Sequence, residues 1–240
     1  MTALSGIHYV QFMKQLHDTL KPNNYLEIGT LAGGTLRVAN CQSIAIDPDF
    51  KILTDVIGKK SALHLFQQTS DSFFRSHDPK TLFGGSLDLA FLDGMHLFEF
   101  LLRDFINTER HCRRNSIIAI HDCVPPHPHN ALRSASDARR AETPTPDWWT
   151  GDVWKLIPTL KHYRPDLRIY VLDCPPTGLV LVTNLESNST ILESEYAAIL
   201  AKFADLELDE YGMDKFATDC NMIDSKKLQT LEQLSRLFWI

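Results

Sequence analysis

Apolar residues recur with two different periods along the chain, and these periods predict its secondary structure. Short apolar runs typical of buried strands occupy residues 25–28, 43–47, 63–67, 87–92, 117–120, 167–172 and 178–182. Helical spacing predicts helices over residues 7–20, 35–40, 72–77, 97–112 and 151–160. Strands that alternate with helices in this way form a parallel sheet covered by helices on both faces.

The last two predicted strands are joined by the short segment Cys174–Gly178, which requires antiparallel neighbours. We therefore predict an α/β fold with a doubly wound, seven-stranded, mostly parallel sheet and an antiparallel last strand. Residues 1–183 would form this domain, and residues 184–240 would form a C-terminal helical extension whose last helix covers 225–239. The extension would pack on the domain or on the second subunit of a homodimer.

A glycine-rich turn follows the first predicted strand, between Glu27 and Gly34. Glycines at such a turn let the backbone approach a ligand that a Cβ would push away. Glu27 lies at the sheet edge where open α/β sheets bind ligands. The spacing of Gly29 and Gly33 fits neither the G-x-G-x-x-G of dinucleotide sites nor the G-K-[ST] of phosphate loops. The alternative is an ordinary joint between a strand and a helix.

Acidic residues end three of the predicted strands. Asp47 follows the second strand, about 20 residues after the glycine turn, where a carboxylate can accept both hydrogens of a ribose diol. Asp93 and Asp122 follow the fourth and fifth strands, and neighbouring strands lie roughly 4.8 Å apart. Two carboxylates this close repel each other unless a cation, a shared proton or donors intervene. The alternatives are solvated or capping roles for all three residues.

The segment 124–150 is rich in proline and has no clear periodicity apart from a short helix over 130–140. A loop of this length in a compact domain is usually functional or mobile. Trp148 and Trp149 would form a lid or a substrate wall, unless the loop is purely structural. A zinc cluster is disfavoured because the spacing of its candidate ligands matches no structural zinc pattern; these are His121, Cys123, His127 and His129.

The composition narrows the class of protein further. The chain is 44% hydrophobic and 22% charged, as expected for a soluble globular protein. A formal net charge of −6 argues against a nucleic-acid partner. No apolar run approaches the roughly 20 residues that cross a bilayer, so we expect no membrane partner. Five scattered cysteines without C-x-x-C spacing favour reduced thiols and a cytoplasmic location.

The assembled motifs resemble those of class I S-adenosylmethionine-dependent methyltransferases over about residues 7–183. The resemblance rests on Glu27-x-Gly29-x-x-x-Gly33, Asp47, Phe91–His96 and Ile120–Asp122. Together with Gly151–Lys155, the endings of the last two motifs resemble a bacterial branch of metal-dependent O-methyltransferases. The resemblance implies that S-adenosylmethionine contacts Glu27, Gly29, Thr30, Gly33, Asp47, Ser70, Asp71 and Asp93.

The chain is also similar to catechol O-methyltransferases, which implies a metal site with one discrepancy. Asp93 and Asp122 match two aspartate ligands of Mg²⁺ or another divalent cation, but Cys123 stands where that family has asparagine. Either His96 or His121 completes the metal shell, or the metal is absent; we assign Asp93, Asp122 and His121. The family's general-base lysine is matched by His96, which we assign with Asp93 to catalysis, because histidine can accept a proton near neutral pH.

The sequence therefore predicts an S-adenosylmethionine-dependent methyltransferase that forms an O-methyl product on a small hydroxylated molecule, such as a sugar or natural product. One alternative is a non-catalytic module that binds the same nucleoside. A nicotinamide-dependent oxidoreductase is disfavoured by the missing glycine fingerprint.

Overall fold

A seven-stranded sheet forms the centre of the structure, a computed structural model that describes residues 4–238. Its strands lie in the order β3-β2-β1-β4-β5-β7-β6, and β7 runs antiparallel to both neighbours while the other pairs are parallel. The predicted fold class is confirmed. The strands are β1 (Asn24–Ile28), β2 (Gln42–Ile46), β3 (Leu63–Phe66), β4 (Leu87–Leu92), β5 (Cys112–His121), β6 (Arg168–Leu172) and β7 (Leu179–Thr183).

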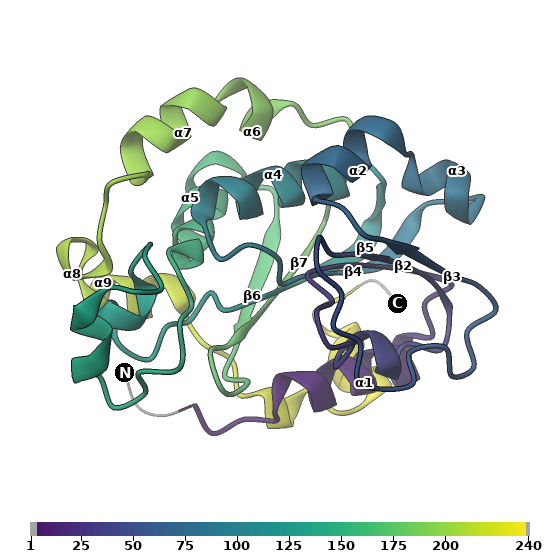
Figure 1. The fold of residues 1–240 in the computed structure, drawn as a ribbon, viewed down its shortest axis with the longest axis horizontal. Coiled ribbons are helices and arrows are strands. Elements are labelled where there is room, and N and C mark those ends of the chain that lie inside the picture. Colours follow the sequence, from purple (N-terminus) through teal and green to yellow (C-terminus); the bar gives the residue numbers. More distant parts are fainter. Residues whose placement is uncertain (1–3, 239–240) are drawn as a thin grey trace.

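Helices cover both faces of this sheet (Figure 1). The α-helices are α1 (Tyr9–Leu20), α2 (Ser70–Ser76), α3 (Pro79–Phe83), α4 (Phe98–Glu109), α5 (Leu156–Tyr163), α6 (Ile191–Ser194), α7 (Tyr196–Phe203), α8 (Leu208–Tyr211), α9 (Met213–Cys220) and α10 (Leu231–Ser235). Short 3-10 turns are η1 (Leu36–Val38), η2 (Pro128–Ala131), η3 (Ala138–Glu142), η4 (Val153–Lys155) and η5 (Ser225–Lys227).

The central strands are buried on both faces, and their side chains alternate between two hydrophobic cores. Leu26 and Ile28 of β1 join the core that α4, α5, α7 and α9 complete. Tyr25, which points to the opposite face of the sheet, joins the core under α1 and α10. This period of two follows from the pleat of an extended chain. It explains why the strands read as nearly continuous apolar runs.

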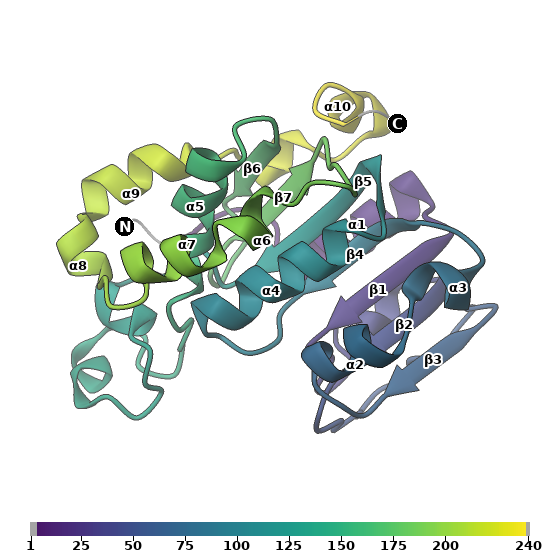
Figure 2. The same ribbon diagram turned by 90° about the horizontal axis from the view of Figure 1, so that it is seen from above.

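The C-terminal extension packs on the sheet of its own chain. Helices α6 to α9 follow the face that carries α4 and α5, and α10 lies near the far end of the sheet (Figure 2). After α9 the chain crosses the edge of the sheet, where Ile223 forms a bridge with Leu172 of β6. Leu228 and Leu234 are then buried in the core under α1. A separate domain status for 184–240 and pairing with a second subunit stay predictions.

Several predicted helix boundaries are wrong for local reasons. The helix predicted over 225–239 is divided into η5 and α10, because Thr230 and Gln233 form a capping box that starts a new helix; Trp239 lies outside the described residues. The helix predicted over 151–160 begins only at Leu156, after η4, and runs to Tyr163; Pro158 lies in its first turn, where proline is tolerated.

Other boundary errors concern strands and short turns. The helix predicted over 97–112 ends at Glu109, and Cys112 already belongs to β5. The helix predicted over 35–40 is the three-residue turn η1. The helix predicted over 130–140 is replaced by η2 and η3.

A buried ion pair joins the C-terminal ends of α4 and α5. The Arg164 guanidinium donates to both oxygens of Glu109, at 2.7 and 2.9 Å, and both residues are buried. Arg164 also donates to Asp166, which is more exposed. Glu109 further accepts the backbone N–H of Glu186 and so holds the start of the C-terminal extension.

We expect Glu109→Ala to lower the free energy of unfolding by roughly 3 kcal/mol, because it leaves a buried guanidinium without its main partner. Urea denaturation at pH 7 measures this change. Glu232→Ala is the matched control, because Glu232 pairs with Arg236 on the exposed surface, where such pairs contribute about 0.5 kcal/mol. Equal losses in the two variants would show that the buried pair is not a structural anchor.

Candidate functional site

The strands that carry the predicted site residues end together at one edge of the sheet. Ile28 pairs with Ile46 and Leu92, and Leu92 pairs with Ile120. The residues that follow these positions therefore lie side by side. A cavity of about 630 Å³ opens at this edge, within the usual range for small-molecule sites. It is lined by Tyr9, residues 28–32, 34–35, 46–48, 69–71 and 93–96, Phe100 and Asp104.

Six of the eight predicted cofactor residues line this cavity. They are Gly29, Thr30, Asp47, Ser70, Asp71 and Asp93. The other two, Glu27 and Gly33, do not line the cavity. Glu27 is fully buried, and Gly33 faces the segment after β2.

The glycine turn depends on close backbone contacts. Gly29 has φ +85°, and a Cβ there would lie 2.0 Å from the carbonyl oxygen of Asp93. Gly33 has φ +82°, and a Cβ would lie 2.5 Å from a methyl group of Val56. These contacts bring the end of β1 against the loop after β4. Because the helix predicted over 35–40 is only the three-residue turn η1, the glycine turn does not lead directly into an α-helix.

Glu27 presents a buried acceptor behind the glycine turn. Its Oε2 accepts a 2.6 Å hydrogen bond from the Tyr25 hydroxyl, whereas Oε1 has no partner among residues 4–238. Burial raises the pKa of Glu27 to about 7, although the Tyr25 hydroxyl acts in the opposite direction. Because buried acceptors are nearly always satisfied in native proteins, this orphaned oxygen fits a ligand that brings a donor, such as an ammonium group.

Asp47 is held rigidly at the cavity wall. Its Oδ2 accepts the backbone N–H of Leu31 and its Oδ1 accepts that of Asp49, both at 2.7 Å. An ionised carboxylate offers about four acceptor positions. The two bonds therefore orient the side chain and leave acceptor positions for a diol.

The start of α2 differs from the sequence-based expectation. Thr69 is the N-cap, and the Asp71 carboxylate pairs with Arg103 of α4 at 2.8–3.2 Å. Asp104, the next residue of α4, was missed by the sequence analysis. It lines the cavity although only 3% of its surface is exposed. Burial raises the pKa of Asp104 to about 7, against a hydrogen bond from Ser70.

Asp93, His96 and Asp122 converge at the other end of the cavity. One ligand atom from each lies within 4.8 Å of the others, an arrangement that could hold a metal ion. His96 Nε2 lies 3.0 Å from Asp122 Oδ2 and 3.6 Å from Asp93 Oδ1. Burial lowers the pKa of His96, but the two carboxylates outweigh it and raise the pKa to about 9.

His121 lies beside this group and holds both carboxylates. Its Nδ1 is 3.3 Å from Asp93 Oδ1 and 3.4 Å from Asp122 Oδ1, and its ring stacks on Tyr9. Its Nε2 faces the hydroxyl of Thr177, which also donates to Asp122. The converging group thus contains His96 where we had assigned His121, whose ligand role stays a prediction.

The remaining members of the disfavoured zinc cluster lie apart from this group. Cys123 is buried, with its thiol directed to the Val153 carbonyl. His127 and His129 face each other in the loop. None of the three is part of the converging group found among residues 4–238.

The segment 124–150 forms a wall against His96. The carbonyl oxygen of Trp149 lies 3.1 Å from His96 Nδ1, and the two rings lie 5.3 Å apart. A Cβ on Gly151 would lie 1.7 Å from the His96 carbonyl oxygen, so the backbones touch here. Trp149, and not the more exposed Trp148, therefore faces the site.

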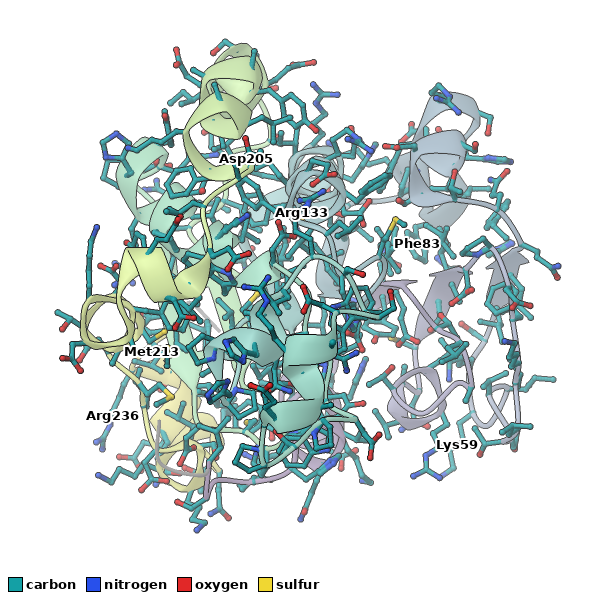
Figure 3. The ribbon with its side chains drawn as sticks, turned by 60° about the vertical axis from the view of Figure 1, so that its left-hand side comes forward. Lys59, Phe83, Arg133, Asp205, Met213 and Arg236 are labelled. Carbon is teal, nitrogen blue, oxygen red and sulfur yellow. The ribbon has the colours of Figure 1, made fainter. Side chains whose placement is uncertain are left out.

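An ion network anchors this wall to α4. Arg133, labelled in Figure 3, donates to Asp152 at 2.6 Å and to both oxygens of Glu99. The other oxygen of Asp152 accepts the N–H of Phe98, the first residue of α4. The sequence analysis missed this role of Asp152, since its partners lie far away in the chain.

Comparisons with known proteins agree with this geometry. Residues 26–123 match the family model of a methyltransferase domain. The structure is similar to cofactor-bound Rv0187 from MTB, with 16% identity, a TM-score of 0.52 and coverage of 73% of this chain and 78% of that chain. It is also similar to SAH-bound PaMTH1, a methyltransferase from Podospora anserina, with 14% identity, a TM-score of 0.51 and coverage of 72% and 76%. The sequence matches no curated protein.

The matched family model and the sheet order agree with each other. Residues 26–123 match a methyltransferase domain, and the seven-stranded sheet that contains them has the fold of solved methyltransferase structures. Among residues 4–238, none of the helices has the length and apolar character needed to cross a membrane.

We expect Asp104→Asn to become progressively more stable than the wild type as the pH rises from 4 to about 7.5. A carboxyl whose pKa is about 7 in the folded protein, against an ordinary value of 3.8, destabilises the fold as it loses its proton. The difference in unfolding free energy should grow by roughly 2–4 kcal/mol over this window. Urea denaturation across the pH range measures it, and parallel curves for the two proteins would contradict the assignment.

Proposed function

We propose that this methyltransferase acts on a hydroxyl oxygen of a small molecule, such as a sugar or another natural product. In this reaction the sulfur–methyl bond of S-adenosylmethionine breaks, an oxygen–methyl bond forms, and the hydroxyl proton leaves to a base or to solvent. The observation that carries the proposal is the convergence of Asp93, His96 and Asp122 beside the cofactor cavity. Methyl transfer needs an in-line nucleophile, so positioning and deprotonation of the acceptor account for most of the catalysis.

The cavity residues fit the parts of the cofactor. The orphaned Glu27 Oε1 and the unpaired Thr30 hydroxyl suit the ammonium and carboxyl groups of its amino acid. Asp47 suits the ribose diol, because its carboxylate is already oriented by two backbone amides. Gly29 keeps the wall free of a side chain where the cofactor would cross the end of β1.

The residues also fit a divalent cation, which would be held by Asp93, Asp122 and His96. Bound there, such an ion would acidify an acceptor hydroxyl. The carboxylates are ligands that Mg²⁺ and Mn²⁺ favour, and an imidazole suits Mn²⁺ and later metals better than Mg²⁺. An Nδ1–H of His96 that donates to the Trp149 carbonyl would leave the Nε2 lone pair available to an ion held between the two carboxylates.

His96 remains the candidate base as well as a candidate ligand. Both roles use Nε2, the atom that faces Asp93 and Asp122. The wall formed by Trp149 would place an acceptor ring next to this imidazole. Metal affinity separates the two roles, because only a ligand contributes to it.

We expect Asp47→Ala to weaken binding of S-adenosylhomocysteine by about ten- to a hundredfold or more, because hydrogen bonds to a charged group contribute about 1.5–3 kcal/mol each. Calorimetry measures the dissociation constant. Asp49→Ala is the matched control, since Asp49 is an exposed neighbour that pairs with Lys51. An unchanged dissociation constant in Asp47→Ala would show that Asp47 does not bind the ribose. Binding of NAD in place of S-adenosylhomocysteine would contradict the proposal that S-adenosylmethionine is the cofactor.

We expect chelation to abolish methyl transfer and added Mg²⁺ or Mn²⁺ to restore it. His96→Asn should weaken Mn²⁺ binding by roughly tenfold or more, because a ligand atom is displaced from the converging group. Calorimetric titration with Mn²⁺ and a transfer assay are run on both proteins. Full activity in the presence of chelator would show that the reaction needs no metal. Lost activity in His96→Asn with unchanged Mn²⁺ affinity would show that His96 acts as a base and not as a metal ligand.

A further inference from the structure

Tyr9, the first residue of α1, lines the cavity and has no part in the proposed cofactor contacts. Its ring stacks on the imidazole of His121, with the ring centroids 3.8 Å apart. His121 in turn lies against Asp93 and Asp122. The stack therefore holds the phenol beside the two carboxylates. Because His121 ends β5, the phenol lies on the side of the reacting group that is away from β2 and Asp47.

Close contacts fix the short segment that carries this tyrosine. The backbone N–H of Tyr9 donates to the Pro175 carbonyl at 3.2 Å, and that of Gly6 donates to the Asp173 carbonyl at 3.1 Å. A Cβ on Gly6 would lie 2.2 Å from both the Asp173 carboxylate and the Ser225 hydroxyl. Residues 6–9 are therefore packed tightly against the connection between β6 and β7, which sets the position of Tyr9 before any acceptor binds.

The Tyr9 hydroxyl is a free hydrogen-bond donor beside the reacting group. Burial, followed by the charges of Asp93 and Asp122, raises the pKa of this hydroxyl. The charges of both carboxylates therefore reach the phenol, but among residues 4–238 no group forms a hydrogen bond with its oxygen. A phenol keeps its proton near neutral pH and can donate it to one acceptor atom. The donor is therefore available to a ligand in the cavity.

The ligand oxygen that suits this donor belongs to the methyl acceptor. The ammonium and carboxyl groups of the cofactor already have proposed partners in Glu27 and Thr30. Its ribose has a proposed partner in Asp47, which lies on the opposite side of the cavity, after β2. A second oxygen of the acceptor, beside the hydroxyl that is methylated, would meet the Tyr9 hydroxyl at the end of β5.

We propose that Tyr9 is an acceptor-binding residue whose hydroxyl donates a hydrogen bond to a second oxygen of the acceptor, beside the hydroxyl that is methylated. This inference rests on the proposed function, because it requires methylation of an oxygen in this cavity. A second contact turns the reacting hydroxyl toward the methyl group, and such orientation lowers the barrier of a bimolecular transfer. An acceptor without the second oxygen leaves the donor unpaired and is disfavoured for that reason.

A divalent cation is the competing explanation for a preference of this kind, because two adjacent oxygens can also bind one ion. Binding through the ion would use Asp93, His96 and Asp122 and would not need the phenol. Tyr9→Phe separates the two explanations. It removes only the hydroxyl and keeps an aromatic ring on His121.

Catechol and phenol are the probes, because they differ only in the second hydroxyl. Methyl transfer to each is measured with saturating S-adenosylmethionine and Mg²⁺. We expect Tyr9→Phe to lower kcat/KM for catechol by about three- to tenfold and to leave that for phenol almost unchanged. Tyr163→Phe is the matched control and should behave as the wild type. The Tyr163 hydroxyl also has no hydrogen-bond partner among residues 4–238, but it lies at the end of α5, outside the cavity.

Calorimetry provides a second readout that does not depend on turnover. Catechol is titrated into protein saturated with S-adenosylhomocysteine and Mg²⁺, and its affinity should fall in Tyr9→Phe by the same factor. The dissociation constant of S-adenosylhomocysteine should not change. An unchanged response to catechol, equal losses for catechol and phenol, or weaker binding of S-adenosylhomocysteine in Tyr9→Phe would overturn the proposal. Failure of the wild type to bind S-adenosylhomocysteine at all would identify the proposed function as the error.

Discussion

Repulsion between two carboxylates is the constraint on which the site depends. Parallel strands that end in register place Asp93 and Asp122 at the same edge of the sheet, and like charges at this separation destabilise each other. Two imidazoles relieve the repulsion, because His96 and His121 each lie against both carboxylates. The same negative charge that the imidazoles balance makes the group suited to a divalent cation.

Contacts from distant segments keep these four side chains in place. The hairpin between β6 and β7 brings the Thr177 hydroxyl onto Asp122, whose backbone has the uncommon φ of +60° for a non-glycine residue. The wall after β5 supplies the Trp149 carbonyl to His96. Asp152 binds the first N–H of α4 and, through Arg133, fixes this wall to the helix. Thr177 and Trp149 hold site residues directly, and Asp152 and Arg133 hold the wall behind them, which is how a site becomes preorganised.

In the cavity, unlike at the group of Asp93, Asp122 and the two histidines, acidic side chains are buried without a cationic partner. Glu27 and Asp104 are buried acids, and burial raises the pKa of both to about 7. Neither forms an ion pair among residues 4–238. Such groups destabilise a fold unless a ligand brings donors to them. They are therefore better explained by binding than by folding, in line with the general conflict between active sites and stability.

The sequence by itself determined where the strands lie along the chain, that most of them are parallel, and the edge of the sheet at which the site lies. A strand buried on both faces shows a short apolar run, and the first polar residue after it marks the end of the strand, as at Asp47 and Asp93. Because parallel strands share one edge, these local signals were enough to bring the predicted carboxylates together. The capping signals of Thr230 and Gln233 were also local, although the longer apolar period over 225–239 masked them.

The tertiary structure alone decided which partners these residues have. Asp71 pairs with Arg103, and Asp104 lines the cavity beside it, because α2 and α4 pack side by side. Tyr9, Trp149 and Thr177 reach the site from segments far apart in the chain. Such contacts depend on how helices and loops pack around the completed sheet. Periodicity and spacing describe only the neighbours of a residue along the chain, so they contain no signal for these contacts.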